Sequence, residues 1–342
     1  MAERLSDKIR EYLGTAIGRN INIKDMRIFL KIEPGSNDDQ NLRTQMSTTM
    51  IKEKLVRPSG RNDGVYKVVT QVKPVRVFDK ARERKQPFDL RFPKDFDTGM
   101  ELDFAEHIVI REGDLIAIGG MSNLGKTTLA LGFLGENIES NPVLMGNEYT
   151  TRIGDTDEYE PTPRFLNRLD IMSIEYGGWV EWTNGTGEDK FTLLPVREDY
   201  AEHIVKDRIN IIDWINLKAD RLYDISAVEE QIKMELGRGI GIAVLQKGDG
   251  EMMRGGQFTK DFIDCELLID KFTDTESLLT IGKVKEYTKP VIGKTYAFGI
   301  SKGVKIINFH EVKKCPTCRG SGFTGGKKCE HCFGNKFVDI EL

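Results

Sequence analysis

In residues 120–127 the chain reads G-M-S-N-L-G-K-T, an uninterrupted match to the phosphate-loop pattern G-x-x-x-x-G-K-[ST]. Glycines at the two ends let the backbone curl, so that successive N–H groups point inward at an anion. Lys126 adds a mobile positive charge for the β- and γ-phosphates, and Thr127 adds a hydroxyl for Mg²⁺. The stretch therefore predicts a nucleotide site with these contact residues: Gly120, Ser122, Asn123, Leu124, Gly125, Lys126, Thr127 and Thr128.

The neighbouring sequence supplies the context that this pattern needs. Residues 114–119 (D-L-I-A-I-G) form a short apolar run typical of a buried strand, and residues 127–134 (T-T-L-A-L-G-F-L) are typical of an apolar helix. A helix that begins at the loop directs the positive end of its dipole at a bound phosphate. A glycine turn that matched by chance would lack both flanks, so we predict a strand, loop and helix unit.

Length and composition indicate several domains and no membrane segment. The 342 residues suggest about two to three domains. No run of about 18 apolar residues occurs, and residues 1–18 lack a signal-peptide core. We therefore expect a soluble, cytoplasmic protein with no membrane partner.

Charge is unevenly distributed along the chain. Residues 1–99 contain 21 Lys and Arg against 14 Asp and Glu, residues 100–312 contain 23 against 37, and residues 313–342 contain 6 against 3. Basic ends around an acidic middle indicate polyanion contacts at the termini, and the alternative is an ordinary solvated surface.

Residues 1–71 have the pattern of three helices and a hairpin. Apolar residues recur at helical spacing in 5–17, 24–31 and 37–54, and a D-G turn then separates two short valine-containing strands. This order resembles a winged helix-turn-helix domain, which implies duplex DNA as a partner; protein interaction is the alternative use of such domains. The third helix and the wing would supply these DNA contacts: Arg43, Thr44, Ser47, Thr48, Lys52 and Arg61.

The rest of the chain divides into a linker and an α/β region. Residues 72–99 contain prolines and many basic residues, which indicates a linker able to wrap a neighbouring subunit. Residues 100–312 alternate short apolar runs with helical patterns, as expected for an α/β fold with a mostly parallel sheet. We predict its strands at 115–118, 142–145, 170–174, 209–212, 241–245 and 265–270, with antiparallel hairpins from runs at 278–284, 293–300 and 303–309.

An apolar strand that ends in a carboxylate, R-I-N-I-I-D at residues 208–213, predicts a second part of the site. Asp213 is placed to hold Mg²⁺, usually through a water molecule. The next residue is Trp214, so the carboxylate that activates water must come from another strand. Residues 142–145 are followed by G-N-E, which makes Glu148 the candidate general base.

The order of these segments resembles the RecA and DnaB-type hexameric helicase superfamily. The matching stretches are residues 211–217 (I-I-D-W-I-N-L), the Mg²⁺ strand, and residues 242–247 (I-A-V-L-Q-K), a polar sensor strand. The resemblance implies a RecA-like phosphate-loop core that uses ATP and Mg²⁺. It implies that Gln246 contacts the γ-phosphate and relays hydrolysis to DNA-binding loops. It also implies a homo-oligomer, a hexameric ring or a filament, that binds single-stranded DNA in its core.

Two later segments follow in the order of that superfamily. Residues 264–270 resemble the strand before a finger hairpin, and residues 282–287 (G-K-V-K-E-Y) resemble the hairpin that carries basic residues to the nucleotide of the next subunit. Lys283 and Lys285 are the candidates for that role. Helicases of this type usually have an arginine here and recombinases a pair of lysines, so the subclass stays open. A solvated strand face is the alternative for K-V-K.

A polar, glycine-rich segment at residues 247–257 follows the sensor strand, where this superfamily places a central DNA-contacting loop. Lys247 and Arg254 would contact DNA phosphates there. An ordinary surface loop is the alternative.

Four of the five cysteines form two C-x-x-C pairs, C-P-T-C at 315–318 and C-E-H-C at 329–332. Two pairs at this separation can close a tetrahedral Zn²⁺ site, whereas a lone pair would indicate redox chemistry. The repeated cysteine and glycine pattern also resembles the zinc modules of DnaJ-type chaperones. We predict a structural zinc finger over residues 313–342 with these ligands: Cys315, Cys318, Cys329 and Cys332.

Together these segments predict a DNA-binding, Mg²⁺-dependent ATPase with a RecA-like core. The leading form is a DNA helicase or replication motor of a phage or mobile element, acting in a bacterial or phage-infected cell. A recombination or repair ATPase similar to RadA is one alternative, because it also joins a four-cysteine module to such a core. An ATP-gated regulator that binds DNA through the winged domain is the other.

Overall fold

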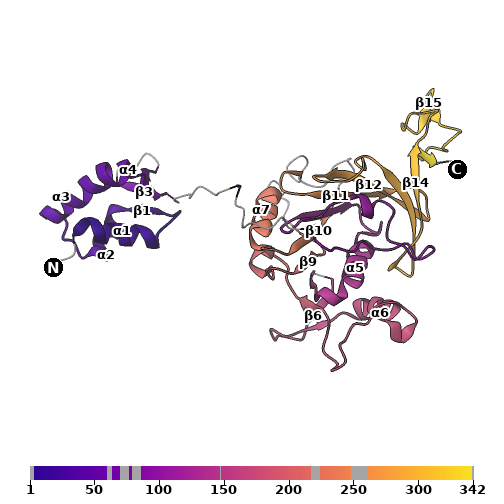
Figure 1. Ribbon diagram of the computed structural model, residues 1–342, viewed down its shortest axis with the longest axis horizontal. Coiled ribbons are helices and arrows are strands. Elements are labelled where there is room, and N and C mark those ends of the chain that lie inside the picture. The colour runs from indigo at the N-terminus through magenta and orange to yellow at the C-terminus, as the bar shows by residue number, and fades with distance from the viewer. Residues whose placement is uncertain are drawn as a thin grey trace. The chain divides into compact units, whose positions relative to one another are not determined.

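The chain folds into two compact units, Met1–Arg84 and Lys85–Leu342 (Figure 1). The computed structural model describes residues 4–59, 64–69, 77–78, 86–146, 148–216, 224–247 and 260–340. None of the helices formed by these described residues is long and apolar enough to cross a membrane.

The first unit packs helices against a small antiparallel sheet. Its elements are α1 (Leu5–Thr15), β1 (Asn20–Asn22), α2 (Ile23–Leu30), α3 (Asn37–Thr44), α4 (Met50–Lys52), β2 (Val56–Pro58) and β3 (Val65–Val68), with the strand order β1-β3-β2. A π-helical turn, Gln45–Thr49, joins α3 to α4 into one continuous helix. The three helical segments and the hairpin lie where the sequence predicted them, and β1 is an additional strand.

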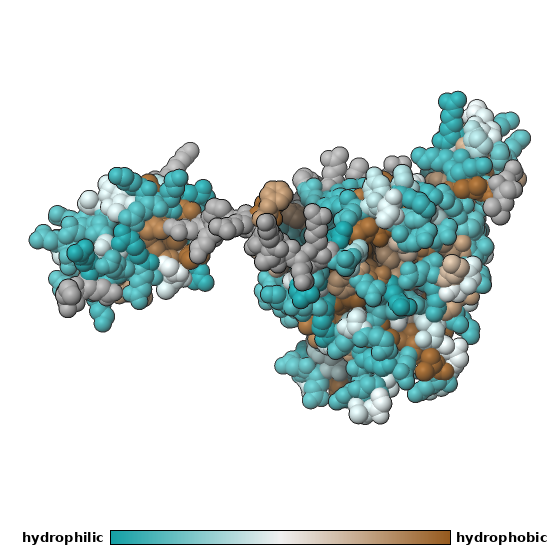
Figure 2. Space-filling view, viewed as in Figure 1, coloured by the Kyte–Doolittle hydropathy of each residue, from teal (hydrophilic) through white to brown (hydrophobic). Residues whose placement is uncertain are grey.

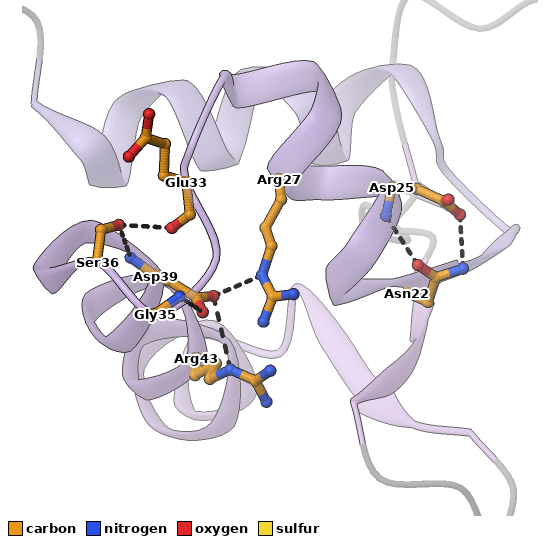
Figure 3. Close-up of polar contacts among 8 residues, drawn as sticks. All are labelled: Asn22, Asp25, Arg27, Glu33, Gly35, Ser36, Asp39 and Arg43. Atoms are coloured by element: carbon orange, nitrogen blue, oxygen red, sulfur yellow. Dashed lines mark hydrogen bonds and ion pairs between the residues drawn. The ribbon is translucent and has the colours of Figure 1, made fainter.

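A buried carboxylate fastens α2 to the start of α3 (Figure 3). Asp39 accepts hydrogen bonds from the backbone N–H of Gly35 at 2.9 Å and from Nε of Arg27 at 2.6 Å. These two donors hold the pKa of Asp39 below its usual value. Ser36 caps α3 by accepting from the Asp39 backbone N–H at 3.2 Å. The helices then enclose one core, which contains these buried side chains: Ile9, Leu13, Met26, Leu42, Met46 and Met50.

One ten-stranded sheet forms the centre of the second unit. Its strands are β4 (Leu115–Gly120), β5 (Val143–Met145), β8 (Thr192–Leu194), β9 (Ile209–Ile212), β10 (Ile240–Gln246), β11 (Cys265–Lys271), β12 (Glu276–Val284), β13 (Thr295–Ser301), β14 (Lys305–Lys314) and β17 (Phe337–Asp339). The order is β17-β14-β13-β12-β11-β4-β10-β9-β5-β8. Pairs from β11 to β8 are parallel, and pairs from β17 to β11 are antiparallel. The predicted α/β class is confirmed, and the large, mostly parallel sheet fits a RecA-like core.

Helices cover both faces of the parallel strands, which is why these strands are apolar along their whole length. The covering helices include α5 (Lys126–Glu136) and α7 (Ile225–Glu235). Alternate residues of β4 serve the two faces. Ile116 and Ile118 belong to the core cluster that contains α5, whereas Leu115 and Ala117 belong to the cluster that contains α7. The phosphate-loop strand is therefore fixed from both sides.

The predicted strand at residues 170–174 is wrong. This stretch contains the end of α6 (Pro163–Met172) and the start of a short 3-10 turn, Ile174–Tyr176. Thr162 caps α6 by accepting a hydrogen bond from the Phe165 backbone N–H at 3.3 Å, and a proline in the first helical turn needs no N–H partner. These helix-start signals outweigh the apolar run that suggested a strand.

Residues 86–99 of the predicted linker pack on the second unit. Phe92 is buried, and its ring lies 5.2 Å from that of Phe133 on α5. The Asn137 side chain accepts from the Arg91 backbone N–H at 3.0 Å and donates to the Arg91 carbonyl at 2.7 Å. This segment therefore contributes to the core that supports α5.

Candidate phosphate-binding site and cysteine cluster

The predicted phosphate loop connects the end of β4 to the start of α5. Gly125 has a φ of +102°, and a Cβ there would lie 2.6 Å from Cδ1 of Ile300. A Cβ on Gly120 would lie 2.9 Å from the carbonyl oxygen of Ile269 on the neighbouring strand. Glycine is therefore required at both ends, at one for its left-handed backbone and at the other for close approach.

Lys126 occupies the first position of α5 and reaches back across the loop. Its Nζ donates a hydrogen bond to the carbonyl oxygen of Met121 at 2.6 Å. Burial lowers the pKa of this amine, while the nearby Asp213 and Glu148 act in the opposite direction. The amine lies where the helix dipole already favours an anion, so loop and helix together suit a phosphate.

Asp213 follows β9 and is only 4 % exposed. Its carboxylate accepts hydrogen bonds from the hydroxyls of Tyr149 and Thr127, and Thr127 is the loop residue predicted to bind Mg²⁺. Burial raises the pKa of Asp213, and the two hydrogen bonds oppose that shift. A carboxylate and a threonine hydroxyl side by side are oxygen ligands of the kind that Mg²⁺ takes, so these residues fit the ion.

Glu148 and Gln246 both lie beside the phosphate loop, because the carboxyl ends of parallel strands lie on the same side of the sheet. Gln246 of β10 is opposite Gly120 of β4 in the strand register, and its Nε2 donates to Oγ of Ser122 at 2.8 Å. Glu148 lies just beyond β5 and is exposed. Its backbone carbonyl accepts a hydrogen bond from Oγ1 of Thr162 at 3.0 Å, which ties it to the start of α6.

A cavity of about 400 Å³ joins most of the predicted site residues, and its volume is ordinary for a ligand site. Neither Gly120 nor Leu124 lines it, and the Leu124 side chain packs against the hydrophobic core instead. Their expected contribution is limited to the backbone. The predicted residues that line the cavity are Ser122, Asn123, Gly125, Lys126, Thr127, Thr128, Glu148, Asp213 and Gln246.

Sequence reasoning missed two arginines in this cavity. Arg164 and Arg168 lie on α6, and with Glu148 they also line an adjoining cavity of about 390 Å³. Neither guanidinium has an ion-pair or hydrogen-bond partner among the residues that the structure describes. Thr-Pro is a typical helix start, and two arginines four residues apart after it lie on one face of that helix, which could have identified them from the sequence. The strand wrongly predicted at residues 170–174 concealed it.

The phosphate loop follows the carboxyl end of β4. The two finger candidates lie toward the other end of these strands. Lys283 pairs in register with Glu266 near the start of β11, whereas Ile269, farther along that strand, is opposite Gly120. Lys285 lies beyond the end of β12. Neither lysine lines the phosphate cavity of its own chain.

Contacts within the chain engage both finger candidates. Lys283 Nζ donates to the carbonyl oxygen of Lys260, and Lys285 Nζ lies 2.6 Å from Oδ1 of Asp264. Burial raises the pKa of the nearby Glu229 to about 8, which favours the neutral form of that carboxyl beside Lys283. To act on a neighbour's nucleotide, Lys285 would have to exchange an ion pair for a phosphate contact.

The DNA-contact candidates of the first unit are exposed where the structure describes them. Arg43 Nε lies 3.5 Å from Asp39. The hydroxyls of Ser47 and Thr48 donate to the Thr44 carbonyl at 3.3 and 2.5 Å, so each already has a backbone partner. Arg61 lies outside the described residues. The exposed candidates are Arg43, Thr44, Ser47, Thr48 and Lys52.

Lys247, which was predicted to contact DNA phosphates in the central loop, lies inside the protein instead. Its side chain is only 5 % exposed, and Nζ lies 2.5 Å from Oδ1 of Asp270 on β11. The amine pairs with Asp270 inside the protein and is not accessible to DNA phosphates. The other candidate of that segment, Arg254, lies outside the described residues.

The cysteine module, residues 315–340, begins where β14 ends and returns to the sheet through β17. Val312, Lys313 and Lys314 of β14 pair with the three residues of β17. A short hairpin between them consists of β15 (Phe323–Thr324) and β16 (Lys327–Lys328). The module is thus held at both ends by the main sheet (Figure 1).

The four predicted metal ligands converge in this module. All four sulfur atoms lie within 4.8 Å of one another, with Sγ of Cys315 3.8 Å from that of Cys329 and Sγ of Cys318 3.6 Å from that of Cys332. A tetrahedral Zn²⁺ with bonds to sulfur of about 2.3 Å places its ligands about 3.8 Å apart, so the cluster fits zinc. The Gly322 N–H donates to Sγ of Cys318 at 3.3 Å, as a metal-bound thiolate requires.

Metal removal is expected to unfold the cysteine module and leave the phosphate site folded. The hydrophobic cluster of the module consists of the four cysteines with Val338 packed against it, so its described residues have little other core. Structural zinc typically contributes about 10–16 kcal/mol of apparent binding free energy in zinc-finger peptides. Metal analysis should find one zinc per chain, and Cys332→Ser should lose it and become protease-sensitive after residue 314. The buried Cys265→Ala is the control and should keep its zinc. Iron in place of zinc, or a protease-resistant module without metal, would contradict this expectation.

Comparisons with known proteins give structural likeness only. No protein-family model and no curated protein matches the chain. It is similar to a KaiC-like protein from the hyperthermophilic archaeon Pyrococcus horikoshii OT3, at 18 % identity over 64 % of this chain and 98 % of that chain, with a TM-score of 0.41. It is also similar to a DnaB-like replicative helicase, solved in a study of its interactions with primase, at 13 % identity over 58 % of this chain and 57 % of that chain, with a TM-score of 0.38. What the site can do follows from its own residues.

Proposed function

We propose that the chain is a Mg²⁺-dependent ATPase of the RecA and DnaB type. One observation carries this proposal: residues from the ends of four parallel strands meet in a single cavity at the phosphate loop. They provide a loop amine, a buried carboxylate beside a hydroxyl, an exposed carboxylate and an amide, namely Lys126, Asp213 with Thr127, Glu148 and Gln246.

Hydrolysis would proceed by attack of water on the γ-phosphorus. Glu148 takes the proton of that water as the new P–O bond forms, and the bond to the β–γ bridging oxygen breaks to give ADP and phosphate. Mg²⁺, held by Thr127 and through water by Asp213, would supply charge neutralisation on the β- and γ-phosphates. Lys126 and the loop N–H groups offset the remaining negative charge.

Two further sets of side chains would complete the site. Gln246 would contact the γ-phosphate, and its hydrogen bond to Ser122 would be exchanged for that contact. Arg164 and Arg168 line the cavity without partners among the described residues, so their charge is available to the same phosphate. Both arginines come from the chain that binds the nucleotide.

We propose that the active form is a homo-oligomer, a hexameric ring or a filament. Lys283 and Lys285 lie toward the sheet edge away from their own phosphate loop. Basic residues in this position become useful to catalysis when they reach the nucleotide of a neighbouring subunit.

DNA is the proposed partner, and a DNA helicase or replication motor of a phage or mobile element is the proposed role. The exposed polar face of α3 and its continuation supports a winged-helix contact with duplex DNA. A RadA-like recombination motor shares the four-cysteine centre. An ATP-gated DNA-binding regulator is favoured by a different observation, the division of the chain into separate DNA-binding and nucleotide-binding candidates.

The test is the ATPase rate with and without single-stranded DNA, measured beside particle images of the oligomeric state. We expect ATP hydrolysis that single-stranded DNA accelerates, by rings or filaments that form with ATP. Hydrolysis that ignores DNA in a chain that stays monomeric would remove both motor proposals. Duplex unwinding separates a helicase from a RadA-like ATPase. A sequence-specific footprint lost in Arg43→Ala and Thr48→Ala would favour the regulator.

A further inference from the structure

The cysteine module and the end of β14 present positive charge that no described residue neutralises. The module's acidic residues among those described are Glu330 and Asp339, and Asp339 already lies 3.1 Å from Nε2 of His310. Six basic side chains are exposed, and none has an ion pair or side-chain hydrogen bond within the described ranges. They are Lys313, Lys314, Arg319, Lys327, Lys328 and Lys336.

Two aromatic rings stand out from the same module. Phe333 is 77 % exposed and Phe323 is 56 % exposed, far more than a ring that serves a core. Phe323 is opposite Lys328 in the hairpin, so both side chains lie on one face of it. The Lys328 side chain also passes 3.5 Å from the Cβ position of Gly334, the residue after Phe333. Lys328 therefore lies opposite Phe323 and close to the backbone of the residue after Phe333.

A groove of about 660 Å³ continues from Phe333 to the main sheet. Phe272, just after β11, Lys313 and Asn335 also line it. Two carboxylates in the lining already have partners, since Glu276 accepts from the Asn308 amide at 2.8 Å and Asp339 lies 3.1 Å from Nε2 of His310. Figure 2 shows the module, at the upper right, as a mostly hydrophilic projection from the second unit. The groove thus combines apolar rings and hydrogen-bonding groups with Lys313, and the other exposed cations lie on the surface outside its lining.

We propose that this surface of the cysteine module binds single-stranded nucleic acid. Unpaired bases would stack on Phe323 and Phe333, and phosphates would pair with the surrounding lysines and arginine. A duplex keeps its base faces inside, so it could use the cations but not the rings. An acidic polypeptide would likewise leave the rings unused, and an apolar peptide would leave the cations unused.

The proposal extends the DNA partner of the proposed function, and it differs from it in location. The central loop at residues 247–257 was the expected single-strand contact, yet Lys247 is buried there. The module offers a second contact that does not depend on nucleotide. A strand held there would lie outside the phosphate cavity, because none of the module's residues lines that cavity.

Binding of fluorescein-labelled oligothymidylate to the full chain, without nucleotide and at several salt concentrations, tests the proposal. Lys327→Ala with Lys328→Ala should reduce the steepness of the log–log salt dependence by about 1.4, since each phosphate contact on a single strand contributes about 0.7. Phe333→Leu should weaken binding about tenfold with an unchanged slope, and Phe333→Tyr should restore it. The matched control replaces two exposed lysines elsewhere, Lys206→Ala with Lys289→Ala, and should bind like the unaltered chain.

Four readouts keep the outcomes separate. Zinc content must equal that of the unaltered chain, because Phe333 is exposed and its loss should not open the metal site. Oligouridylate is measured in parallel, and the same variant response with either sugar supports the proposal. Unchanged affinity in both the lysine and the Phe333 variants, or displacement of the oligonucleotide by polyglutamate as efficiently as by unlabelled oligothymidylate, overturns it. ATP hydrolysis without DNA, measured on the same variants, reports on the proposed ATPase independently.

Discussion

Lys126→Ala is expected to abolish ATP turnover, with a loss on the order of 10²-fold or more. Its amine is the side-chain cation of the phosphate loop, at the first position of α5, and it is a counter-charge for the neighbouring Asp213 and Glu148. Removing it therefore costs the bound triphosphate its nearest positive partner while the loop backbone stays in place. Steady-state phosphate release at saturating ATP measures the effect, and nucleotide affinity should fall as well.

Lys206→Ala is the matched control for this change, because Lys206 is exposed and lies outside the phosphate cavity. It should hydrolyse ATP at the unaltered rate. A Lys126→Ala chain that keeps more than half of the normal rate would remove the phosphate loop from the reaction, and the cavity would need another explanation.

Glu148→Gln is expected to stop hydrolysis while ATP still binds. General-base catalysis typically contributes about 10²- to 10⁴-fold, and glutamine has nearly the same shape without the ability to take a proton. Glu148 is exposed, and its hydrogen bond to the start of α6 among the described residues uses its backbone carbonyl, so the substitution should not disturb the fold. Single-turnover hydrolysis and the affinity for a fluorescent ATP analogue, measured side by side, separate the chemical step from binding.

Glu158→Gln serves as the comparison, because Glu158 is an exposed carboxylate in the hairpin after Glu148. Normal hydrolysis by Glu148→Gln would mean that the proton is taken elsewhere. Loss of both binding and hydrolysis would instead indicate that Glu148 has a role in holding the nucleotide.

Most residues of the phosphate cavity could be predicted from the sequence, because each of them lies at the end of a strand. Gln246 was predicted from the resemblance to the RecA and DnaB-type superfamily. Asp213 and Glu148 each follow an apolar run, and parallel strands end on the same side of a sheet. No long-range information was needed for that step. The loop itself was predicted by its glycines, and the clashes that a Cβ would meet at Gly120 and Gly125 give the physical reason.

Residues that depend on pairing across the fold were not predictable in the same way. Lys247 is polar and follows a strand, like a surface residue, and its burial depends on Asp270, which belongs to another strand of the sheet. Arg164 and Arg168 were hidden because an apolar run at the end of α6 suggested a strand, although Thr162 and Pro163 already favoured a helix start. A tertiary partner explains the burial of Lys247, and helix capping explains the position of the two arginines.

The strand β14 connects the phosphate site to the cysteine module. The turn before it contains Gly303, whose carbonyl accepts a hydrogen bond from Thr128 of the phosphate loop at 3.0 Å. Cys315 directly follows its last residue, and ten residues in an extended strand span about 33 Å. A single strand therefore connects the turn beside the phosphate loop to the cysteine module, with an irregularity at Asn308, whose φ is +52°. A dye pair placed at its two ends would report whether nucleotide binding changes the separation of the phosphate loop and the cysteine module.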